Sequence, residues 1–267
     1  MANLRIALIG VGRMGMALAS GWQSSRSRPD IILVDPQPSP LAQAMAEEEG
    51  LPLNPPPIPV DVVVIAVKPQ IFETATPDIK PWIGPETRII SIMAGTRLKH
   101  MQQALETDRV LRAMPNTPGA IGKGVSVISA PDGMSQKDIN TAIGLLKPLG
   151  DVLGPVPEAQ ISAVTGVSGS GPAYVFLLVE ALASAGEAEG LPADLALKLA
   201  QETIIGAAAL LEETGEHPED LRKAVTSKNG TTEAALDILM RGDGMPSLMR
   251  EAVRAATSRE RALSAGK

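Results

Sequence analysis

The sequence predicts an α/β fold, with an N-terminal doubly wound sheet followed by an all-α C-terminal part. Short β-rich runs alternate with helical stretches through the first 156 residues, and several runs are apolar almost throughout. Such runs are typical of parallel strands that are covered on both faces. All but three of the 23 prolines lie at or before Pro172. Because proline is excluded from helix interiors, only the later part can hold long helices. We therefore predict two domains, 1–156 and 157–267.

The elements of the first domain follow from this alternation. The predicted strands are Leu4–Ile9, Ile31–Val34, Asp61–Val67, Arg88–Met93, Val110–Ala113, Gly124–Ile128 and Asp151–Leu153. The predicted helices between them are Met14–Gln23, Leu41–Glu49, Leu98–Leu105 and Ser135–Leu146. The proline-rich segment Asn54–Pro59 cannot be helical, so we expect an extended link before the third strand.

The second domain is predicted to contain helices only. These are Tyr174–Glu189, Ala193–Thr214, Glu219–Val225, Glu233–Arg241 and Ser247–Leu263. The late prolines stand where helices begin, which is the position that tolerates proline. Several of these helices are apolar over most of their surface, which predicts burial against a partner subunit and hence a homo-oligomer.

Composition excludes several classes of function. The net charge is −6, and the chain has two Trp, one Tyr and two Phe, which argues against a nucleic-acid-binding surface. There is no cysteine and there are only two histidines, so we expect no metal site. No uninterrupted apolar run approaches roughly 20 residues, and no export signal is recognisable at the start. We therefore expect a cytoplasmic protein that does not bind membranes.

A glycine-rich motif lies directly after the first predicted strand and opens the first predicted helix. In this frame, the first glycine allows a tight turn, the second lets the backbone approach a pyrophosphate, and the third lets helix and strand pack closely. The helix N-terminus adds unpaired N–H groups for the phosphates. The motif predicts a Rossmann-like dinucleotide site formed by Gly10, Val11, Gly12, Arg13, Met14 and Gly15.

Asp35 bears on the choice of dinucleotide. It lies twenty residues beyond Gly15, at the end of the second predicted strand. A carboxylate there accepts hydrogen bonds from a ribose 2′-hydroxyl but repels a 2′-phosphate. Asp35 therefore favours NADH over NADPH, while Arg13 in the glycine loop would partly offset the repulsion.

Two later strand ends face the same crevice, because ligands of parallel sheets collect at the carboxyl ends of the strands. Lys68 follows the third strand, and it is either a ribose or phosphate contact or a strand terminator that reaches solvent. Ala94 follows the fourth strand. After the fifth strand, Asn116 stands between two prolines and either lines the crevice or caps its own turn.

Two loops of the second half are unusually polar or small. The segment 226–232 (TSKNGTT) is either a nest of N–H groups suited to a carboxylate or an ordinary N-cap. The segment Gly166–Tyr174 is rich in glycine and serine, and it either lets the backbone pass a flat ring or forms a hinge.

These motifs together resemble the pyrroline-5-carboxylate reductase family. The resemblance covers nearly the whole chain, through LRIALIGVGRMG, VVVIAVKPQ, RAMPNTP, VTGVSGSGPAYVF, ETGEHPEDL and VTSKNGTTEAAL. The last motif is far more specific than the glycine loop. The family reduces 1-pyrroline-5-carboxylate to L-proline with NADPH or NADH, in the last step of proline biosynthesis. It forms homodimers through interlocked C-terminal helices, and often homodecamers.

The resemblance also implies roles for individual residues. Cofactor contacts fall on the glycine loop and on Asn54, Ala66, Val67, Lys68, Pro69 and Ala94. Substrate binding falls on Ser227, Asn229, Gly230, Thr231 and Thr232, and the Thr232 hydroxyl is placed by the ring nitrogen as the catalytic group. Two departures stand out. Many family members have a neutral residue in place of Asp35, and Lys228-Asn229 replaces the commoner Pro-Gly.

Two other functions compete with this interpretation. A hydroxyacid dehydrogenase of the same architecture would need a general base, and Lys68 or Lys228 would have to serve. A dinucleotide-binding protein without catalytic activity would have no reason to keep the hydroxyl-rich loop. Reduction of a cyclic imine needs no general base, because the iminium is already electrophilic and the positioning of the two reactants supplies much of the rate.

Overall fold

The computed structural model of the chain describes residues 4–25 and 28–265. In these residues, seven strands form one sheet in the order β2-β1-β3-β4-β5-β6-β7. The strands are β1 (Arg5–Ile9), β2 (Asp30–Val34), β3 (Val62–Ile65), β4 (Arg88–Ser91), β5 (Val110–Met114), β6 (Gly124–Ser129) and β7 (Gly150–Leu153). All seven predicted strands are therefore confirmed, with ends that shift by one or two residues.

The sheet is mixed where the sequence predicted a parallel one. Strands β1 to β5 run parallel, but β6 pairs with β5 in the antiparallel direction. Only the short turn around η3 (Thr117–Ile121) joins β5 to β6, and a parallel return needs a crossover of about a dozen residues or more. Helix α5 supplies such a crossover between β6 and β7, which are parallel again.

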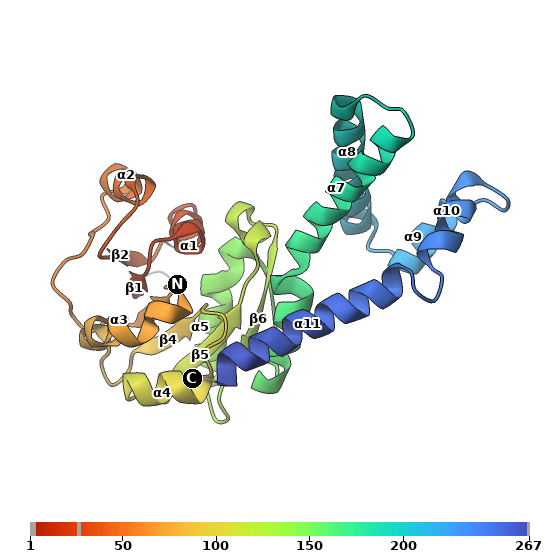
Figure 1. Cartoon of the computed structure of the whole chain (residues 1–267). Helices are drawn as coiled ribbons and strands as arrows, with labels where there is room; N and C mark the ends of the chain where they lie inside the picture. Colours follow the sequence, from red (N-terminus) through yellow and green to blue (C-terminus); the bar gives the residue numbers. More distant parts are fainter. Residues whose placement is uncertain (1–3, 26–27, 266–267) are drawn as a thin grey trace. The chain divides into compact units, whose positions relative to one another are not determined.

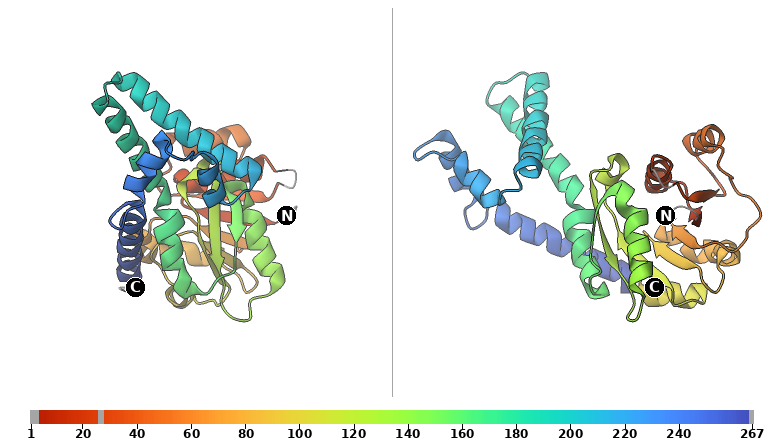
Figure 2. Two further views of the ribbon diagram at one scale, coloured as in Figure 1. Left: turned by 90° about the vertical axis from the view of Figure 1, so that its right-hand side faces the viewer. Right: turned by 180° about the vertical axis from the view of Figure 1, so that it is seen from behind.

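Helices cover both faces of the sheet (Figures 1 and 2). One face packs against α1 (Arg13–Gln23), α2 (Pro40–Glu49) and α5 (Gln136–Leu146). The other packs against α3 (Phe72–Ile79) and α4 (Leu98–Leu105), with short turns at η1 (Pro69–Ile71) and η2 (Lys80–Trp82). Turn η4 (Lys147–Leu149) belongs to the α1 side through Leu149, and η5 (Glu158–Gln160) follows β7. The sequence analysis missed α3 because Pro77 interrupts its pattern, although Phe72, Thr76 and Ile79 are buried at helical spacing.

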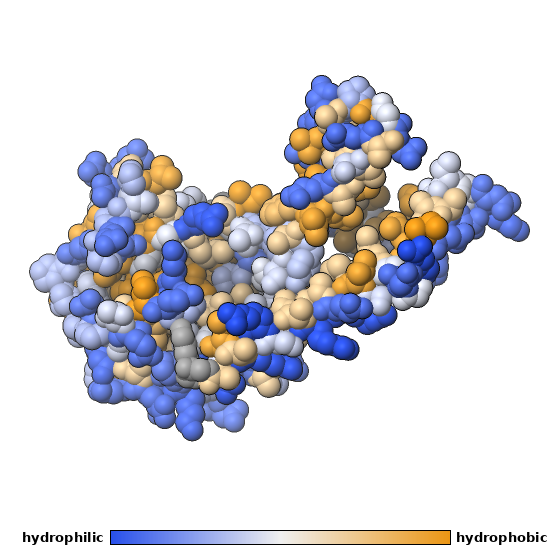
Figure 3. All heavy atoms as spheres, in the orientation of Figure 1, coloured by the Kyte–Doolittle hydropathy of each residue, from blue (hydrophilic) through white to orange (hydrophobic). Residues whose placement is uncertain are grey.

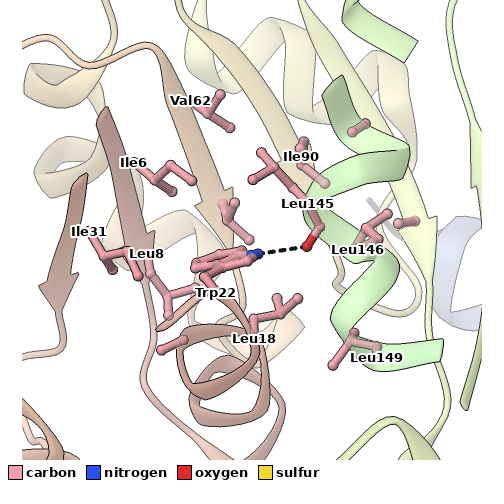
Figure 4. Packing of buried hydrophobic residues seen from close by; sticks show 14 of the residues in the cluster. Ile6, Leu8, Leu18, Trp22, Ile31, Val62, Ile90, Leu145, Leu146 and Leu149 are labelled. Carbon is pink, nitrogen blue, oxygen red and sulfur yellow. Dashed lines mark hydrogen bonds between the residues drawn. The ribbon is translucent and has the colours of Figure 1, made fainter. Parts of the chain in front are cut away.

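Trp22 anchors the core between α1 and α5. Its ring is fully buried, and its indole Nε1 donates a 2.7 Å hydrogen bond to the Leu145 carbonyl oxygen. Figure 4 shows the ring among Leu8, Leu18 and Leu146. This hydrogen bond joins α1, which begins at the glycine motif, to α5, and it gives the motif a rigid support.

The C-terminal part is helical, as predicted. Its helices are α6 (Ile161–Val164), the π-helical turn η6 (Thr165–Gly169), α7 (Gly171–Ala188), α8 (Ala193–Thr214), α9 (Pro218–Ala224), α10 (Thr231–Leu239) and α11 (Met245–Ala265). The small-residue segment Gly166–Tyr174 is helical. It completes η6 and begins α7.

The chain divides into two compact units. Unit 1 comprises residues up to Ser170 together with the residues from Ala255 onward, and unit 2 is Gly171–Arg254. The sequence analysis instead drew the boundary after residue 156. The boundary in the structure lies later than the predicted one because Ile161 of α6 packs with Met114 and Val127 of the sheet. The last turns of α11 also belong to unit 1.

One helical stretch among the described residues, Glu158–Ala188, is long and apolar enough to cross a membrane by length and composition alone. The sequence analysis expected no such stretch, because it counted uninterrupted apolar runs. In the structure, η6 continues the helix from α6 into α7 and lengthens it. Only 11% of its most apolar window is buried, so the surface of this stretch needs a partner of some kind.

Candidate functional site

The glycine loop between β1 and α1 has the geometry of a phosphate cradle. Gly10 has φ +94°, and its N–H donates to the Val34 carbonyl oxygen at 2.8 Å. A Cβ on Gly15 would lie 2.3 Å from the Gly10 carbonyl oxygen, so only glycine allows this close packing. A Cβ on Gly12, in contrast, would meet nothing within 4 Å.

Gly12 is therefore the place where a ligand can approach the backbone. It is the N-cap of α1 and has no side-chain capping bond, and the first N–H groups of a helix have no partner within the helix. Arg13 is exposed at the same turn, and Met14 is half-buried. The open space at Gly12, together with the helix dipole, fits the pyrophosphate of a dinucleotide.

Asp35 follows β2 and is tied to the glycine loop. Its carboxylate accepts hydrogen bonds from the backbone N–H groups of Val11 and Gln37, each at 2.9 Å. The side chain of Asn54 accepts from the Asp35 N–H at 2.9 Å and donates to the Asp35 carbonyl oxygen at 2.8 Å. The structure thus brings Asn54, Asp35 and the glycine loop together at one corner of the crevice.

The segment after β3 lies beside the loop as the parallel order of the strands requires. The Ala66 N–H donates to the Ile9 carbonyl oxygen at 2.8 Å, and a Cβ on Gly10 would contact the Ala66 and Val67 atoms at 2.9 and 3.0 Å. Lys68 is exposed, and Pro69 begins η1. Among the described residues no salt bridge holds Lys68, so its ammonium group can contact an anionic ligand.

The turns after β4 and β5 complete this edge of the sheet. Ala94 is half-buried against the cluster of Met114, Val127 and Ile161. The Asn116 side chain accepts a hydrogen bond from the Val125 N–H at 2.9 Å. Asn116 therefore fastens its loop to β6. It is the N-cap of η3 but makes no side-chain capping bond, so the structure does not show it capping its own turn.

The polar loop of unit 2 forms a tight turn before α10. The Gly230 N–H donates to the Ser227 carbonyl oxygen at 3.0 Å, and a Cβ on Gly230 would lie 2.4 Å from the Ser227 Oγ. Gly230 is the N-cap of α10 and has no side-chain capping bond. Within the described chain, the hydroxyls of Ser227, Thr231 and Thr232 make no hydrogen bond. The loop thus presents hydroxyls and unpaired N–H groups at one helix N-terminus.

The backbone conformation of Asn229 accounts for how this loop accommodates Lys228-Asn229. This residue has φ +59°, a left-handed conformation that favours glycine and that Asn accepts more readily than most residues. Its N–H donates to the Glu233 Oε2 at 2.6 Å. Sequence reasoning missed Glu233, although its place three residues after the N-cap is the spacing of a capping box.

Comparison with known proteins covers both units. A family model described as pyrroline-5-carboxylate reductase dimerisation matches residues 158–263, and one described as NADP oxidoreductase, coenzyme F420-dependent, matches residues 5–95. A pyrroline-5-carboxylate reductase of Pisum sativum is 37% identical over 97% of this chain and 96% of its own length. One of Pseudomonas aeruginosa is 37% identical over 99% of this chain and 98% of its own. The chain belongs to the pyrroline-5-carboxylate reductase family.

Solved structures agree with this family membership. A pyrroline-5-carboxylate reductase of Coxiella burnetii superposes with a TM-score of 0.89 at 31% identity, covering 98% of this chain and 99% of that one. A pyrroline carboxylate reductase of Plasmodium falciparum, solved with NADP bound, gives 0.80 at 24% identity and covers 99% of both chains. The fold of an N-terminal Rossmann-like sheet with a helical C-terminal part is thus the fold of the family.

In the described part of the chain, no salt bridge joins an acid and a base within the glycine loop or the polar loop of unit 2. The buried carboxyls with a lowered pKa are Asp138 and Glu260, and both are held by arginines away from the glycine loop. Among the described residues, no three His, Asp or Glu side chains are grouped to hold a metal ion. The hydroxyls and unpaired N–H groups of the two loops can bind and orient a ligand through hydrogen bonds.

Proposed function

We propose that this enzyme reduces 1-pyrroline-5-carboxylate to L-proline with a hydride from NAD(P)H, as the last step of proline biosynthesis. The observation that carries the proposal is the family relationship along the whole chain, which includes both the glycine loop and the hydroxyl-rich loop. A protein that only bound a dinucleotide would have no use for the second loop.

Each part of the proposed site has its own role in binding the cofactor or the substrate. The backbone of Gly10–Gly15 holds the pyrophosphate, Lys68 contacts a ribose or a phosphate of the cofactor, and Ala94 borders the nicotinamide. Ser227 and Thr231 hold the substrate carboxylate through their hydroxyls and the unpaired N–H groups at the start of α10, and Asn229 and Gly230 form the turn that presents them. The Thr232 hydroxyl oxygen accepts a hydrogen bond from the protonated ring nitrogen. When bound, NAD(P)H supplies the hydride that reaches the imine carbon.

Little acid catalysis is required of the protein. The imine nitrogen is protonated near neutral pH, so the iminium carbon accepts the hydride and the nitrogen becomes the amine of proline. Holding the two reactants in contact is then the main catalytic contribution. A site built from backbone amides and hydroxyls, without a histidine or a carboxylate pair, is sufficient for this reaction.

We further propose that NADH is the preferred coenzyme. The Asp35 carboxylate is held in place by two backbone N–H groups, and its oxygens retain lone pairs for a ribose 2′-hydroxyl. A 2′-phosphate at the same place would meet its negative charge.

The active form is proposed to be a homodimer, assembled further into a homodecamer, in the cytoplasm. Unit 2 exposes large apolar side chains in a single chain, and Figure 3 shows them along α7 and α8. They include Phe176, Leu177, Leu182, Leu195, Leu199 and Ile205. A partner subunit on this surface would also cover the apolar stretch that begins at Glu158, without a membrane.

The decisive experiment is the initial rate of coenzyme oxidation with 1-pyrroline-5-carboxylate, measured with NADH and with NADPH. We expect turnover with both and a higher kcat/KM with NADH. Light scattering on the same sample should give a dimer or a multiple of it. Folded, oligomeric protein that oxidises neither coenzyme would refute the proposed function.

Thr232→Ala tests the catalytic assignment in the same assay. Loss of the hydroxyl should lower kcat/KM roughly tenfold to a few hundredfold, or about 1–3 kcal/mol. Thr141→Ala, in which an exposed hydroxyl of α5 is removed, is the matched control. A loss of less than twofold in Thr232→Ala would remove this residue from the mechanism.

A further inference from the structure

Arg112 is a buried charge that the proposed function does not use. It lies in the middle of β5 with 2% of its side chain exposed. Its guanidinium contacts two carboxylates from distant parts of the chain, Glu158 at 3.5 Å and Glu260 at 2.7 Å. Buried ion pairs contribute little net stability compared with apolar packing of similar volume, so their role is often in positioning.

The first carboxylate holds the start of α4. Oε1 of Glu158 accepts a 2.6 Å hydrogen bond from the backbone N–H of Leu98, the first residue of that helix. The same oxygen faces Arg112. Arg112 and Glu158 together therefore fix the point where the chain enters α4 after the β4 turn.

The second carboxylate holds the end of α11. Glu260 is 3% exposed, and its Oε1 accepts hydrogen bonds from Arg112 and from the Ser264 hydroxyl, the latter at 2.9 Å. Leu263 lies in the same turn of α11 as Glu260, and it packs against the loop that follows β4. A Cβ on Gly95 would be 3.4 Å from the Leu263 Cβ.

Both contacts converge on the turn Ala94–Arg97. This turn follows β4 at the carboxyl edge of the sheet, where dinucleotides bind in such folds. Gly95 has φ +63°, and Thr96 is fully buried. One side of the turn is set by the Glu158 cap on α4, and the other side is covered by Leu263.

We propose that Arg112, Glu158 and Glu260 form a positioning cluster that fixes the turn Ala94–Arg97. This turn in consequence fixes the position at which the nicotinamide binds. This inference rests on the proposed use of the crevice for NAD(P)H. None of the three residues contacts the reacting atoms. They act through the turn, so their removal affects the nicotinamide end of the cofactor and not the adenosine end, which is held at Asp35.

The test uses two variants that differ in how far they disturb the fold. Leu263→Gly removes the Cβ that faces Gly95 but keeps the ion pairs, and Leu263 is 48% exposed in the last turn of α11, so the protein should fold. Glu260→Gln removes one charge of the cluster and keeps the shape of the side chain. Leu153→Ala, on β7 and 55% exposed, is the matched control.

The readout is binding to the full-length protein without substrate. NADH affinity is measured by the fluorescence of its dihydronicotinamide, and ADP-ribose affinity by calorimetry. We expect both variants to bind NADH about fivefold to twentyfold more weakly and ADP-ribose within about twofold of wild type. The control should match wild type in both, and kcat should fall in the two variants.

Equal losses for NADH and ADP-ribose in Glu260→Gln, the variant of a cluster residue, or no loss for either, would overturn the proposal. A lower melting temperature with an unchanged ratio of the two affinities would show a purely structural role and would overturn it as well. Wild-type protein that binds NADH but does not reduce 1-pyrroline-5-carboxylate would refute the proposed function alone, because these binding measurements do not depend on it.

Discussion

Asp35 has a structural role and, in the proposed function, a selective one. Its carboxylate closes the corner between β2 and the glycine loop through the Val11 N–H. Asn54 holds the backbone of the same residue from the other side. The charge is therefore fixed in place, and a fixed charge discriminates better between a hydroxyl and a phosphate than a mobile one does.

Replacement of Asp35 by serine should move the coenzyme preference toward NADPH. The substitution removes the repulsion of a 2′-phosphate, and we expect the NADPH-to-NADH ratio of kcat/KM to rise about tenfold, or roughly 1.4 kcal/mol. Steady-state kinetics with both coenzymes measure this ratio. Asp30→Ser makes the same charge change at the opposite end of β2, so it should leave the ratio as in wild type. An unchanged ratio in Asp35→Ser would assign the preference to another residue.

At the scale of elements, the turn from β1 to α1 contains glycines of two kinds. Gly15 is required by the packing, because a Cβ there would overlap the Gly10 carbonyl oxygen. Gly12 has ordinary backbone angles, φ −74° and ψ −173°, and open space around it. The fold needs Gly15, and in the proposed function the bound dinucleotide needs Gly12.

The pair of variants Gly12→Ala and Gly15→Ala separates these two requirements. Gly12→Ala should keep or slightly raise the melting temperature, because alanine lowers the entropy of the unfolded chain. It should nevertheless weaken NADH binding about tenfold or more, since the methyl group occupies the place of the pyrophosphate. Gly15→Ala should lower the melting temperature. Calorimetry and fluorescence titration measure both effects, and normal NADH binding by Gly12→Ala would contradict the assignment.

At the scale of the whole molecule, two buried carboxyls join distant segments. Burial acts to raise the pKa of Asp138, but hydrogen bonds from Arg88 and Ser135 outweigh it and hold the pKa below its usual value. Burial likewise opposes the hydrogen bonds from Ser162, Arg112 and Ser264 that keep the pKa of Glu260 low. Both groups are more acidic in the folded state than in the unfolded chain.

The free energy of unfolding should therefore fall in acid. A lowered pKa contributes stability that is fully present above the unfolded value and is lost as the pH falls through the folded value. The loss should begin below about pH 4, the ordinary range of carboxyl groups. Urea unfolding between pH 7 and pH 3 measures it, and Asp138→Asn should flatten the dependence. Constant stability over this range would show that the arginines do not hold these carboxylates in solution.

The sequence alone determined the strand–helix alternation, the glycine loop, the helical second half and the family. These features are local, because periodicity, proline positions and short motifs depend on neighbours along the chain. The roles of the individual site residues are still predictions. They were assigned from motif positions, and the loops that carry them lie in different units.

Only the tertiary structure decided which distant residues meet. The reversal of β6 follows from the short connection after β5, and α3 forms despite Pro77 because the sheet buries its apolar face. The contacts of Asn54 with Asp35 and of Arg112 with Glu260 join segments 19 and 148 residues apart. No local pattern encodes such pairs, because they exist only after the strands and helices have packed.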